Sequence, residues 1–323
     1  MKAIVHSQYG SPDVLRLENI DNPAPGDGEV LIEVHAAALN PFDRHFLRGM
    51  PYVGRPAMGL RRPKTTRVGI DLAGRVVAAG PNVTHCQPGD EVFGGGDGSC
   101  AEYVITSQNR VAPKPARLTF EQAAAVPMAA TTALQALRDK AGVQPGHSVL
   151  VNGASGGVGT FAVQIARAFG ATVTGVCSTR NLDLVRFLGA AHVIDYTQSD
   201  LTRSGAQYDV IIDCIGNVPL WKIRRVLRRG GVYVAVGGPG GRWLGPLRHL
   251  FKVALADRLT SDRLVAFMAQ SRRRDLLAIR DLLESAEIAP VIDRVYPLDE
   301  TAAAMHYLEQ GHARGKVVIR IAR

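Results

Sequence analysis

The glycine-rich stretch at 153–159, GASGGVG, is the part of the chain best suited to bind a ligand. An apolar run at 148–151 precedes it, apolar residues at helical spacing follow over 161–169, and a second apolar, β-branched run covers 171–177. This order predicts a strand, a tight turn, a helix and a second strand. Residues without a Cβ let backbone N–H groups close on a diphosphate, and the helix N-terminus adds partial positive charge. The segment 147–180 therefore predicts a dinucleotide site; a purely structural glycine turn is the alternative.

The end of the second predicted strand indicates which nucleotide is bound. Enzymes that use NAD place an acidic residue there to accept a hydrogen bond from the ribose 2′-hydroxyl. This chain has Cys177 at that position, followed by Ser178, Thr179 and Arg180. Hydroxyls and a guanidinium suit a 2′-phosphate, which is dianionic and rich in acceptors. The sequence therefore predicts NADPH as the cofactor, against the alternative of an exposed polar turn.

Length and composition are those of a globular enzyme. A chain of 323 residues usually forms two domains, each able to bury a core, and 46% of the residues are hydrophobic. The formal charge of +9 suits anionic ligands such as NADPH and also nucleic acid. The four cysteines form no CxxC pair, which argues against a disulfide framework or a zinc ribbon.

Targeting and membrane signals are weak in this sequence. The first ten residues, MKAIVHSQYG, run directly into a predicted strand without an apolar signal region, and no run of about 18 apolar residues follows. We therefore expect a cytoplasmic protein that does not associate with membranes.

The first 120 residues differ in pattern from the rest. Short β-like runs at 3–5, 30–37, 71–79, 91–93 and 101–105 are separated by Pro/Gly clusters, which predicts a mostly antiparallel β domain. A helix is expected from Thr119, because Glu121 and Gln122 follow it before an Ala-rich run.

Repeated βα units occupy the second half of the chain. Beyond the glycine-rich unit we expect strands at 192–195, 210–214 and 232–237, a helix at 218–228 and helical structure over about 258–285. The chain should close with a strand at 291–297, a helix at 300–310 and a strand at 316–321. The segment 54–67 is expected to be a flexible loop.

Several segments in the same order carry a resemblance to a known family. The chain resembles the medium-chain dehydrogenase/reductase superfamily, in its zinc-independent quinone oxidoreductase branch, over essentially its whole length. The matching segments are NPFD (40–43), GIDLAG (69–74), PGDEVF (88–93), AEY (101–103), AATTA (129–133), the glycine stretch, YDVIID (208–213) and GKVV (315–318).

The resemblance implies an α/β fold in which a Rossmann domain, a doubly wound parallel sheet, is inserted into a GroES-like, mostly antiparallel β domain. The expected boundaries are 1–122 for the first part of the GroES-like catalytic domain, 123–265 for the Rossmann NADP-binding domain, and 266–323 for the return to the catalytic domain. By analogy with relatives that pair through the edge of the Rossmann sheet, a homodimer is also expected.

The zinc ligands of the family's alcohol dehydrogenases are absent from the matching positions. Those positions read NPFD (40–43) and GID (69–71), and the four-Cys lobe for structural zinc is missing. We therefore expect no metal. Without a Lewis acid, stabilising an alkoxide is difficult, so reduction is the easier direction. The resemblance then implies hydride transfer from NADPH to a quinone or an α,β-unsaturated carbonyl, an enone or enal.

Catalytic roles are assigned from the resemblance. Asn40 is expected to touch the nicotinamide ribose or polarise the substrate carbonyl, or else simply to form the turn before Pro41. Asp43 is expected to orient its loop. The family often has a tyrosine two residues after that aspartate, where this chain has His45. His45, Tyr52 and bulk water are therefore alternative proton donors. Thr131 or Thr132 should lie beside the nicotinamide.

The cofactor is expected to contact residues from several parts of the chain. Tyr196 and Ile215 are expected to flank the adenine. Gly237, Gly238 and Pro239 should pass near the nicotinamide, while Lys316 either adds charge to the phosphates or caps the final strand. The expected contacts of the glycine stretch come from Ala154, Ser155, Gly156, Gly157, Val158 and Gly159.

One basic segment suggests another substrate class. Arg55, Arg61, Arg62, Lys64 and Arg67 lie in one predicted loop, where they would recruit a phosphate-bearing substrate such as an acyl-CoA enoyl thioester.

The alternative to an enzyme is an NADPH-sensing nucleic-acid-binding protein. It rests on arginines at 224–229 and 272–274, but no aromatic residues are interleaved with them for base stacking, so nucleic acid is not the expected partner.

Overall fold

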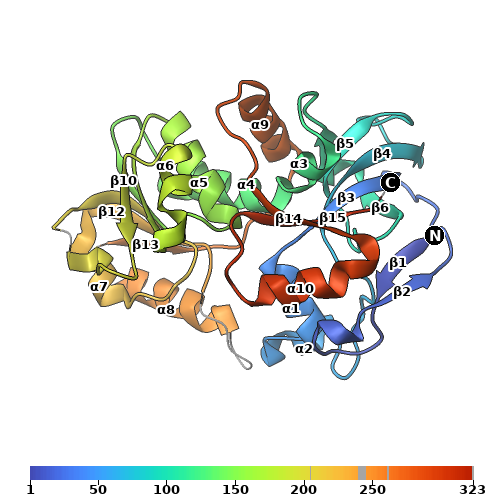
Figure 1. Cartoon of the computed structure of the whole chain (residues 1–323), viewed down its shortest axis with the longest axis horizontal. Helices are drawn as coiled ribbons and strands as arrows, with labels where there is room; N and C mark the ends of the chain where they lie inside the picture. The colour runs from blue at the N-terminus through green and yellow to red at the C-terminus, as the bar shows by residue number, and fades with distance from the viewer. Residues whose placement is uncertain (204, 239–244, 260–261, 322–323) are drawn as a thin grey trace. The chain divides into compact units, whose positions relative to one another are not determined.

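The structure is a computed structural model, and it describes the whole chain except residues 204, 239–244, 260–261 and 322–323. The chain divides into two compact units (Figure 1). The β unit comprises Met1–Thr131, Ser271–Ala286 and Pro290–Arg323, and the nucleotide unit comprises Thr132–Gln270 with the short return Glu287–Ala289.

The nucleotide unit is built on a six-stranded sheet in which every neighbouring pair is parallel, in the order β10-β9-β8-β11-β12-β13. The central strands are nearly continuous runs of Val, Ile and Leu, as expected for strands covered on both faces. The strands are β8 (Ser148–Asn152), β9 (Thr172–Cys177), β10 (His192–Asp195), β11 (Tyr208–Asp213), β12 (Leu227–Ala235) and β13 (Arg263–Ala266).

Helices cover both faces of this sheet. In Figure 1, α5 and α6 lie on one side, and α7 and α8 lie on the other, as in a doubly wound fold. Because β8 is central and the order reverses there, the carboxyl ends of β8 and β11 form the position at which such sheets bind ligands. The helices are η4 (Gln135–Ala141, a π-helix), α5 (Gly157–Ala168), η5 (Thr179–Asn181), α6 (Leu182–Phe187), η6 (Leu201–Arg203), α7 (Leu220–Val226) and α8 (Gly245–Leu259).

The β unit contains a seven-stranded sheet and a separate hairpin, β1-β2. The main sheet follows the order β14-β15-β3-β4-β5-β7, with β6 also paired to β3, and only β14 and β15 are parallel. Its strands are β3 (Glu29–Leu39), β4 (Asp71–Ala79), β5 (Glu91–Gly95), β6 (Tyr103–Ser107), β7 (Val111–Pro113), β14 (Ile292–Pro297) and β15 (Lys316–Arg320); the hairpin is β1 (Lys2–Val5) and β2 (Arg16–Asn19).

Helices of the β unit connect and cover these strands. Thr119 begins α3 as expected: its hydroxyl accepts a hydrogen bond from the Gln122 N–H, and the Gln122 side chain accepts one from the Thr119 N–H. The helices are η1 (Pro12–Val14), α1 (Pro41–Arg48), η2 (Tyr52–Gly54), α2 (Arg55–Met58), η3 (Gln108–Arg110), α3 (Phe120–Ala124), α4 (Pro127–Leu134), α9 (Arg273–Glu284), η7 (Leu298–Glu300) and α10 (Thr301–Glu309).

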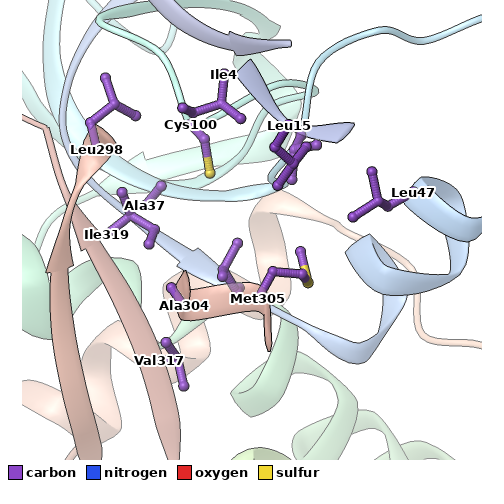
Figure 2. Packing of buried hydrophobic residues seen from close by; sticks show 12 residues of the cluster. Ile4, Leu15, Ala37, Leu47, Cys100, Leu298, Ala304, Met305, Val317 and Ile319 are labelled. Atoms are coloured by element: carbon purple, nitrogen blue, oxygen red, sulfur yellow. The ribbon is translucent and has the colours of Figure 1, made fainter. Parts of the chain in front are cut away.

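One apolar cluster of the β unit joins both ends of the chain. Figure 2 shows Ala304 and Met305 of α10 gathered with Leu47 of α1 and with Val317 and Ile319 of β15. All five are completely buried, and burial of each larger side chain contributes about 1.5–3 kcal/mol. This packing fixes α1 and β15, which carry the polar residues described below.

The expected fold class is confirmed, but four local predictions were wrong or incomplete. The helix expected at 218–228 ends at Val226, because Leu227 already belongs to β12. The helical structure expected over 258–285 contains the strand β13, whose short apolar run pairs with β12. The loop expected at 54–67 contains the helix α2. Strands β2 and β7 were not anticipated, since β2 is exposed throughout and β7 has three residues.

Candidate active site

The glycine stretch forms a closed turn between β8 and α5. Gly153 has φ +85°, a conformation that favours glycine, and the Gly156 N–H donates to its carbonyl oxygen over 3.1 Å. At Gly159 a Cβ atom would lie 2.0 Å from that same oxygen, whereas at Gly156 the nearest atom would be 3.5 Å away. Gly156 is the N-cap of α5, so the free N–H groups of the first helical turn are available to an anion.

Asn181 ties this turn to the end of β9, a role that the sequence had not suggested. Its amide nitrogen donates to Ser155 Oγ over 3.0 Å and to Ser178 Oγ over 3.2 Å. Asn181 is buried, and its Oδ1 has no hydrogen-bond partner among the described residues. Two predicted cofactor residues, Ser155 and Ser178, are thereby brought together. Because Asn181 lies one residue beyond the predicted phosphate-binding residues, only the folded η5 turn reveals its contact.

Thr179 and Tyr196 lie at the same edge of the sheet. Thr179 Oγ1 donates to Asp195 Oδ2 over 2.5 Å, and the Tyr196 N–H donates to the carbonyl of Cys177 over 3.1 Å. Tyr196 is 56% exposed, as a residue that stacks on a ligand requires. Arg180 is exposed on η5.

The end of β11 holds the other expected cofactor residues. Ile215 is 44% exposed, and its N–H donates to the buried carboxylate of Asp213 over 3.0 Å, as does that of Gly216 over 2.8 Å. Gly237 follows β12, and a Cβ there would lie 2.2 Å from the Cys214 carbonyl oxygen, so only glycine fits. Gly238 is half-buried, while Pro239 lies outside the described residues.

A polar chain that sequence reasoning missed supports the loop after β11. Asp213 accepts from Asn152 Nδ2 over 2.9 Å and from the Tyr233 hydroxyl over 2.8 Å, and that hydroxyl lies 3.1 Å from His249 Nε2. Burial lowers the pKa of His249, which favours its neutral form. The strand ends of the nucleotide unit are therefore fixed by side chains as well as by the sheet.

In the β unit, Asn40, Asp71 and Lys316 form a buried polar cluster, which we call the lysine cluster. The Lys316 ammonium donates to Asn40 Oδ1 and, over 3.1 Å, to Asp71 Oδ2. Asn40 Nδ2 donates to the same Asp71 oxygen over 3.0 Å and approaches the Ala38 carbonyl at 3.4 Å. None of the three residues is more than 3% exposed. The amide of Asn40 is thus fully engaged by protein groups.

The lysine cluster also holds helix α4 in place. Asp71 Oδ1 accepts the Met128 N–H over 3.0 Å, which satisfies an N-terminal donor of that helix. The next turn of α4 carries Thr131, which is buried, and Thr132, which is half-buried. Lys316 therefore lies beside Asn40. Asp71, which accepts hydrogen bonds from both, also caps α4, the helix that carries Thr131.

Asp43 supports the other side of Asn40. Its carboxylate accepts the Asn40 N–H over 2.7 Å at the start of α1. Burial raises the pKa of Asp43 to about 7, although the hydrogen bond from Asn40 opposes this. The expectation that Asp43 orients its loop agrees with these contacts.

The two candidate proton donors occupy different surroundings. His45 lies on α1; its Nδ1 is buried without a partner among the described residues, and burial lowers its pKa. Tyr52 lies in η2, where the Arg55 guanidinium sits 4.6 Å from its ring centroid. Arg55 also covers the ring of Tyr9 at 4.7 Å. Because its pKa is lowered, a smaller fraction of His45 is protonated at a given pH than of a free histidine, but the neutral ring still carries one N–H donor.

Within the described part of the chain, no group of three His, Cys, Asp or Glu side chains is arranged to hold a metal ion. Across the same residues, no helix has the length and apolar character needed to span a membrane.

Comparison with known proteins places this geometry in a family. A model described as an alcohol dehydrogenase GroES-like domain matches residues 26–116, and one described as a zinc-binding dehydrogenase matches 188–319.

Two curated relatives and one solved structure are similar over nearly the whole chain. The mitochondrial NAD(P)H oxidoreductase RTN4IP1 of Mus musculus is 34% identical over 99% of this chain and 89% of its own. The chloroplastic NADPH-dependent alkenal/one oxidoreductase of Arabidopsis thaliana is 36% identical over 99% and 79%. The structure of the quinone oxidoreductase from Coxiella burnetii has a TM-score of 0.88 at 31% identity, covering 99% of each chain.

The glycine turn at the head of a parallel sheet, the GroES-like unit and these matches lead to one assignment. The chain is a nicotinamide-dependent oxidoreductase that belongs to the medium-chain dehydrogenase/reductase superfamily, in its quinone oxidoreductase-like branch.

Proposed function

We propose that this protein uses NADPH to reduce a quinone or an α,β-unsaturated carbonyl without a metal ion. The observation that carries the proposal is the closed glycine turn of 153–159 at the head of α5, in a chain that aligns from end to end with a protein named as an NADPH-dependent alkenal/one oxidoreductase. When bound, NADPH supplies a hydride to the electron-poor carbon of the substrate. The amide groups of 154–159 would hold its diphosphate, and Ser178 and Arg180 its 2′-phosphate.

The lysine cluster has a positioning role in this proposal. Because both hydrogens of the Asn40 amide face protein oxygens, Asn40 has none left to polarise a substrate carbonyl. Its contacts instead fix the start of α1 and, through Asp71, the start of α4. These two helices carry the residues proposed to meet the substrate and the nicotinamide, namely His45 and Thr131.

Proton delivery to the developing enolate is assigned to His45, with Tyr52 as the competing donor. The partnerless Nδ1 of His45 is the observation that favours it, since a buried ring nitrogen lacking a partner among the described residues is available to a ligand. Tyr52 is half-buried and packed against Arg55.

Turnover with a panel of quinones and enones, followed by the loss of NADPH absorbance, tests the proposal. The parent protein should oxidise NADPH with at least one substrate. His45→Gln should lower kcat more than it raises KM, whereas Tyr52→Phe should change neither by more than about twofold. A fall in kcat with Tyr52→Phe but not with His45→Gln would assign the role of proton donor to Tyr52. If the parent protein oxidised NADPH with none of the substrates, the proposed reaction class would be contradicted.

A second candidate substrate is an enoyl thioester that carries phosphate groups. The observation that favours it is the exposure of Arg61, Arg62 and Lys64, none of which forms an ion pair within the described residues. The double variant Arg61→Ala/Arg62→Ala should raise KM for a CoA enoyl thioester and leave KM for a small enone unchanged. Equal KM values for the thioester in parent and variant would exclude this substrate class.

The structure gives little support to nucleic-acid binding. Of the arginines near α7, Arg224 is paired with Asp262 at 2.5 Å and Arg228 with Asp209 at 2.7 Å, while Arg225 stacks on Trp221. Paired guanidiniums contribute less to phosphate binding than free ones.

The homodimer and the cytoplasmic location stay predictions. Sedimentation would test the first and cell fractionation the second; two relatives carry mitochondrial and chloroplastic names.

A further inference from the structure

Enzymes that use NAD have an acidic residue at the end of the strand that corresponds to β9, and this chain lacks it. A carboxylate lies next to that position on the neighbouring strand. In β9 that position is Cys177, and the neighbouring strand β10 places Asp195 directly beside it in the parallel register. The Tyr196 N–H, next along the chain, donates to the Cys177 carbonyl and so holds the two strand ends together. A carboxylate therefore reaches this edge from the adjacent strand.

The hydrogen bonds around Asp195 decide what Thr179 can do. Thr179 Oγ1 donates to Asp195 Oδ2 over 2.5 Å, and the Thr197 hydroxyl donates to Oδ1 over 2.7 Å, alongside the Thr197 N–H over 2.9 Å. A hydroxyl has a single hydrogen, so Thr179 presents only acceptor lone pairs to a ligand. It cannot donate to a phosphate while it is bound to Asp195.

Ser178 is in the opposite state. Its Oγ accepts from the Asn181 amide over 3.2 Å, which leaves the hydroxyl hydrogen free. Of the two hydroxyls at the end of β9, one can therefore donate to a 2′-phosphate and the other cannot.

Asp195 is negatively charged and has no cationic partner within the described residues. Its hydrogen bond with Thr179 is the largest cause that lowers its pKa, and the bonds from Thr197 add to it. The hydroxyl and backbone N–H groups of Thr179 and Thr197 surround this carboxylate, which is only half-buried and can still meet a donor such as a ribose hydroxyl.

We infer that Asp195 sets the ratio of NADH to NADPH binding: it accepts the 2′-hydroxyl of NADH in place of the acid missing at Cys177, and it disfavours the 2′-phosphate of NADPH by its charge and by withholding the Thr179 hydrogen. This inference rests on the proposed nicotinamide site. It assigns the protein a dual-cofactor site in which Ser178 and Arg180 favour NADPH and Asp195 opposes them.

The test compares Asp195→Asn with Asp200→Asn. Asp200 is a matched control, because it also accepts the N–H and hydroxyl of the threonine two residues on, over 2.9 and 2.6 Å. Asp200 is exposed, lies beyond β10 and pairs with Lys222 at 3.5 Å. Dissociation constants of NADPH and NADH for the parent and both variants would be measured by fluorescence titration, which requires no substrate.

Asp195→Asn should tighten NADPH binding about tenfold, the effect of a unit charge on a phosphate dianion about 6 Å away in water. It should weaken NADH binding severalfold, because a neutral amide accepts a weaker hydrogen bond than a carboxylate. Asp200→Asn should leave the ratio of the two constants within about twofold of the parent. An unchanged ratio in Asp195→Asn, or equal shifts in both variants, would overturn the inference.

A second measurement does not depend on the folding of Asp195→Asn. Thr179→Val removes the hydroxyl and keeps Asp195. Because the hydrogen of that hydroxyl is donated to Asp195 and not to a phosphate, Thr179→Val should leave NADPH affinity within about twofold of the parent; a tenfold loss would contradict the inference. A parent protein that binds neither nucleotide would refute the proposed function as well, whereas tight binding with an unchanged ratio refutes only the role of Asp195.

Discussion

The glycine turn and the lysine cluster are built in opposite ways. The turn is proposed to bind through backbone N–H groups, and its residues are neighbours in the chain, from Gly153 to Gly159. The lysine cluster consists of side chains from Asn40, Asp71 and Lys316, with the last two 245 residues apart, and all of them are buried. A site made of backbone groups depends on its glycines, because an added Cβ would close the turn to a ligand or force it open. A buried charged cluster instead depends on every one of its side chains.

The largest effect is expected from breaking the lysine cluster. Lys316→Met leaves the carboxylate of Asp71 buried without its cation, and loss of one partner from a buried pair costs about 3–5 kcal/mol. Urea unfolding should show a loss of that size, while Lys2→Met at an exposed position should change the free energy of unfolding by less than about 0.5 kcal/mol. Similar midpoints for both variants would show that the cluster is not a structural element.

The second effect is a dependence of the free energy of unfolding on pH, which arises beside the lysine cluster and not at the glycine turn. Burial raises the pKa of Asp43 to about 7 in the folded protein, from an ordinary value near 4 when unfolded. The folded state therefore binds more protons between about pH 4 and 7, and its stability falls as pH rises through that window, by up to about 1.4 kcal/mol per unit.

Asp43→Asn removes this titration. The free energy of unfolding of the variant, measured from pH 4 to 7, should lack the part of the downward slope that Asp43 gives the parent. Parallel pH profiles for parent and variant would contradict the raised pKa.

A third comparison tests the turn with two neighbouring glycines. Gly159→Ala would bring a Cβ to 2.0 Å from the Gly153 oxygen, so the turn must open at a cost of about 1–3 kcal/mol. Gly156→Ala meets nothing closer than 3.5 Å and should leave stability nearly unchanged. It would still weaken NADPH binding, by up to about a hundredfold, because the added methyl displaces the diphosphate. NADPH affinity equal to the parent in Gly156→Ala would show that the diphosphate does not approach this amide.

The smallest effect concerns the link between the turn and β9. Asn181→Ala removes the hydrogen bonds to Ser155 and Ser178, each worth about 1 kcal/mol, so NADPH binding should weaken severalfold. Asn109→Ala, at an exposed position of the β unit, serves as the control for the same titration. An unchanged dissociation constant in Asn181→Ala would show that the two serines are positioned without it.

Prediction from sequence succeeded where the signal is local. The capping box at Thr119, the strands β4 and β10 and the glycine turn follow from neighbouring residues and their periodicity. It failed at β13, whose four residues follow a helical pattern in the chain and become a strand only because β12 offers a parallel edge. The helix expected at 218–228 ended early for the same reason.

The sequence by itself determined the family, the order of the βα units as far as β12 and the glycine turn at 153–159, because these depend on residue types at short spacing. Only the tertiary structure decided the partners of side chains distant in the chain: Lys316 with Asn40 and Asp71, Asn181 between two serines, and Asp195 beside Cys177. The physical reason is that a hydrogen bond depends on distance and direction in space, and strand register and helix packing, which fix these, are set by the whole fold.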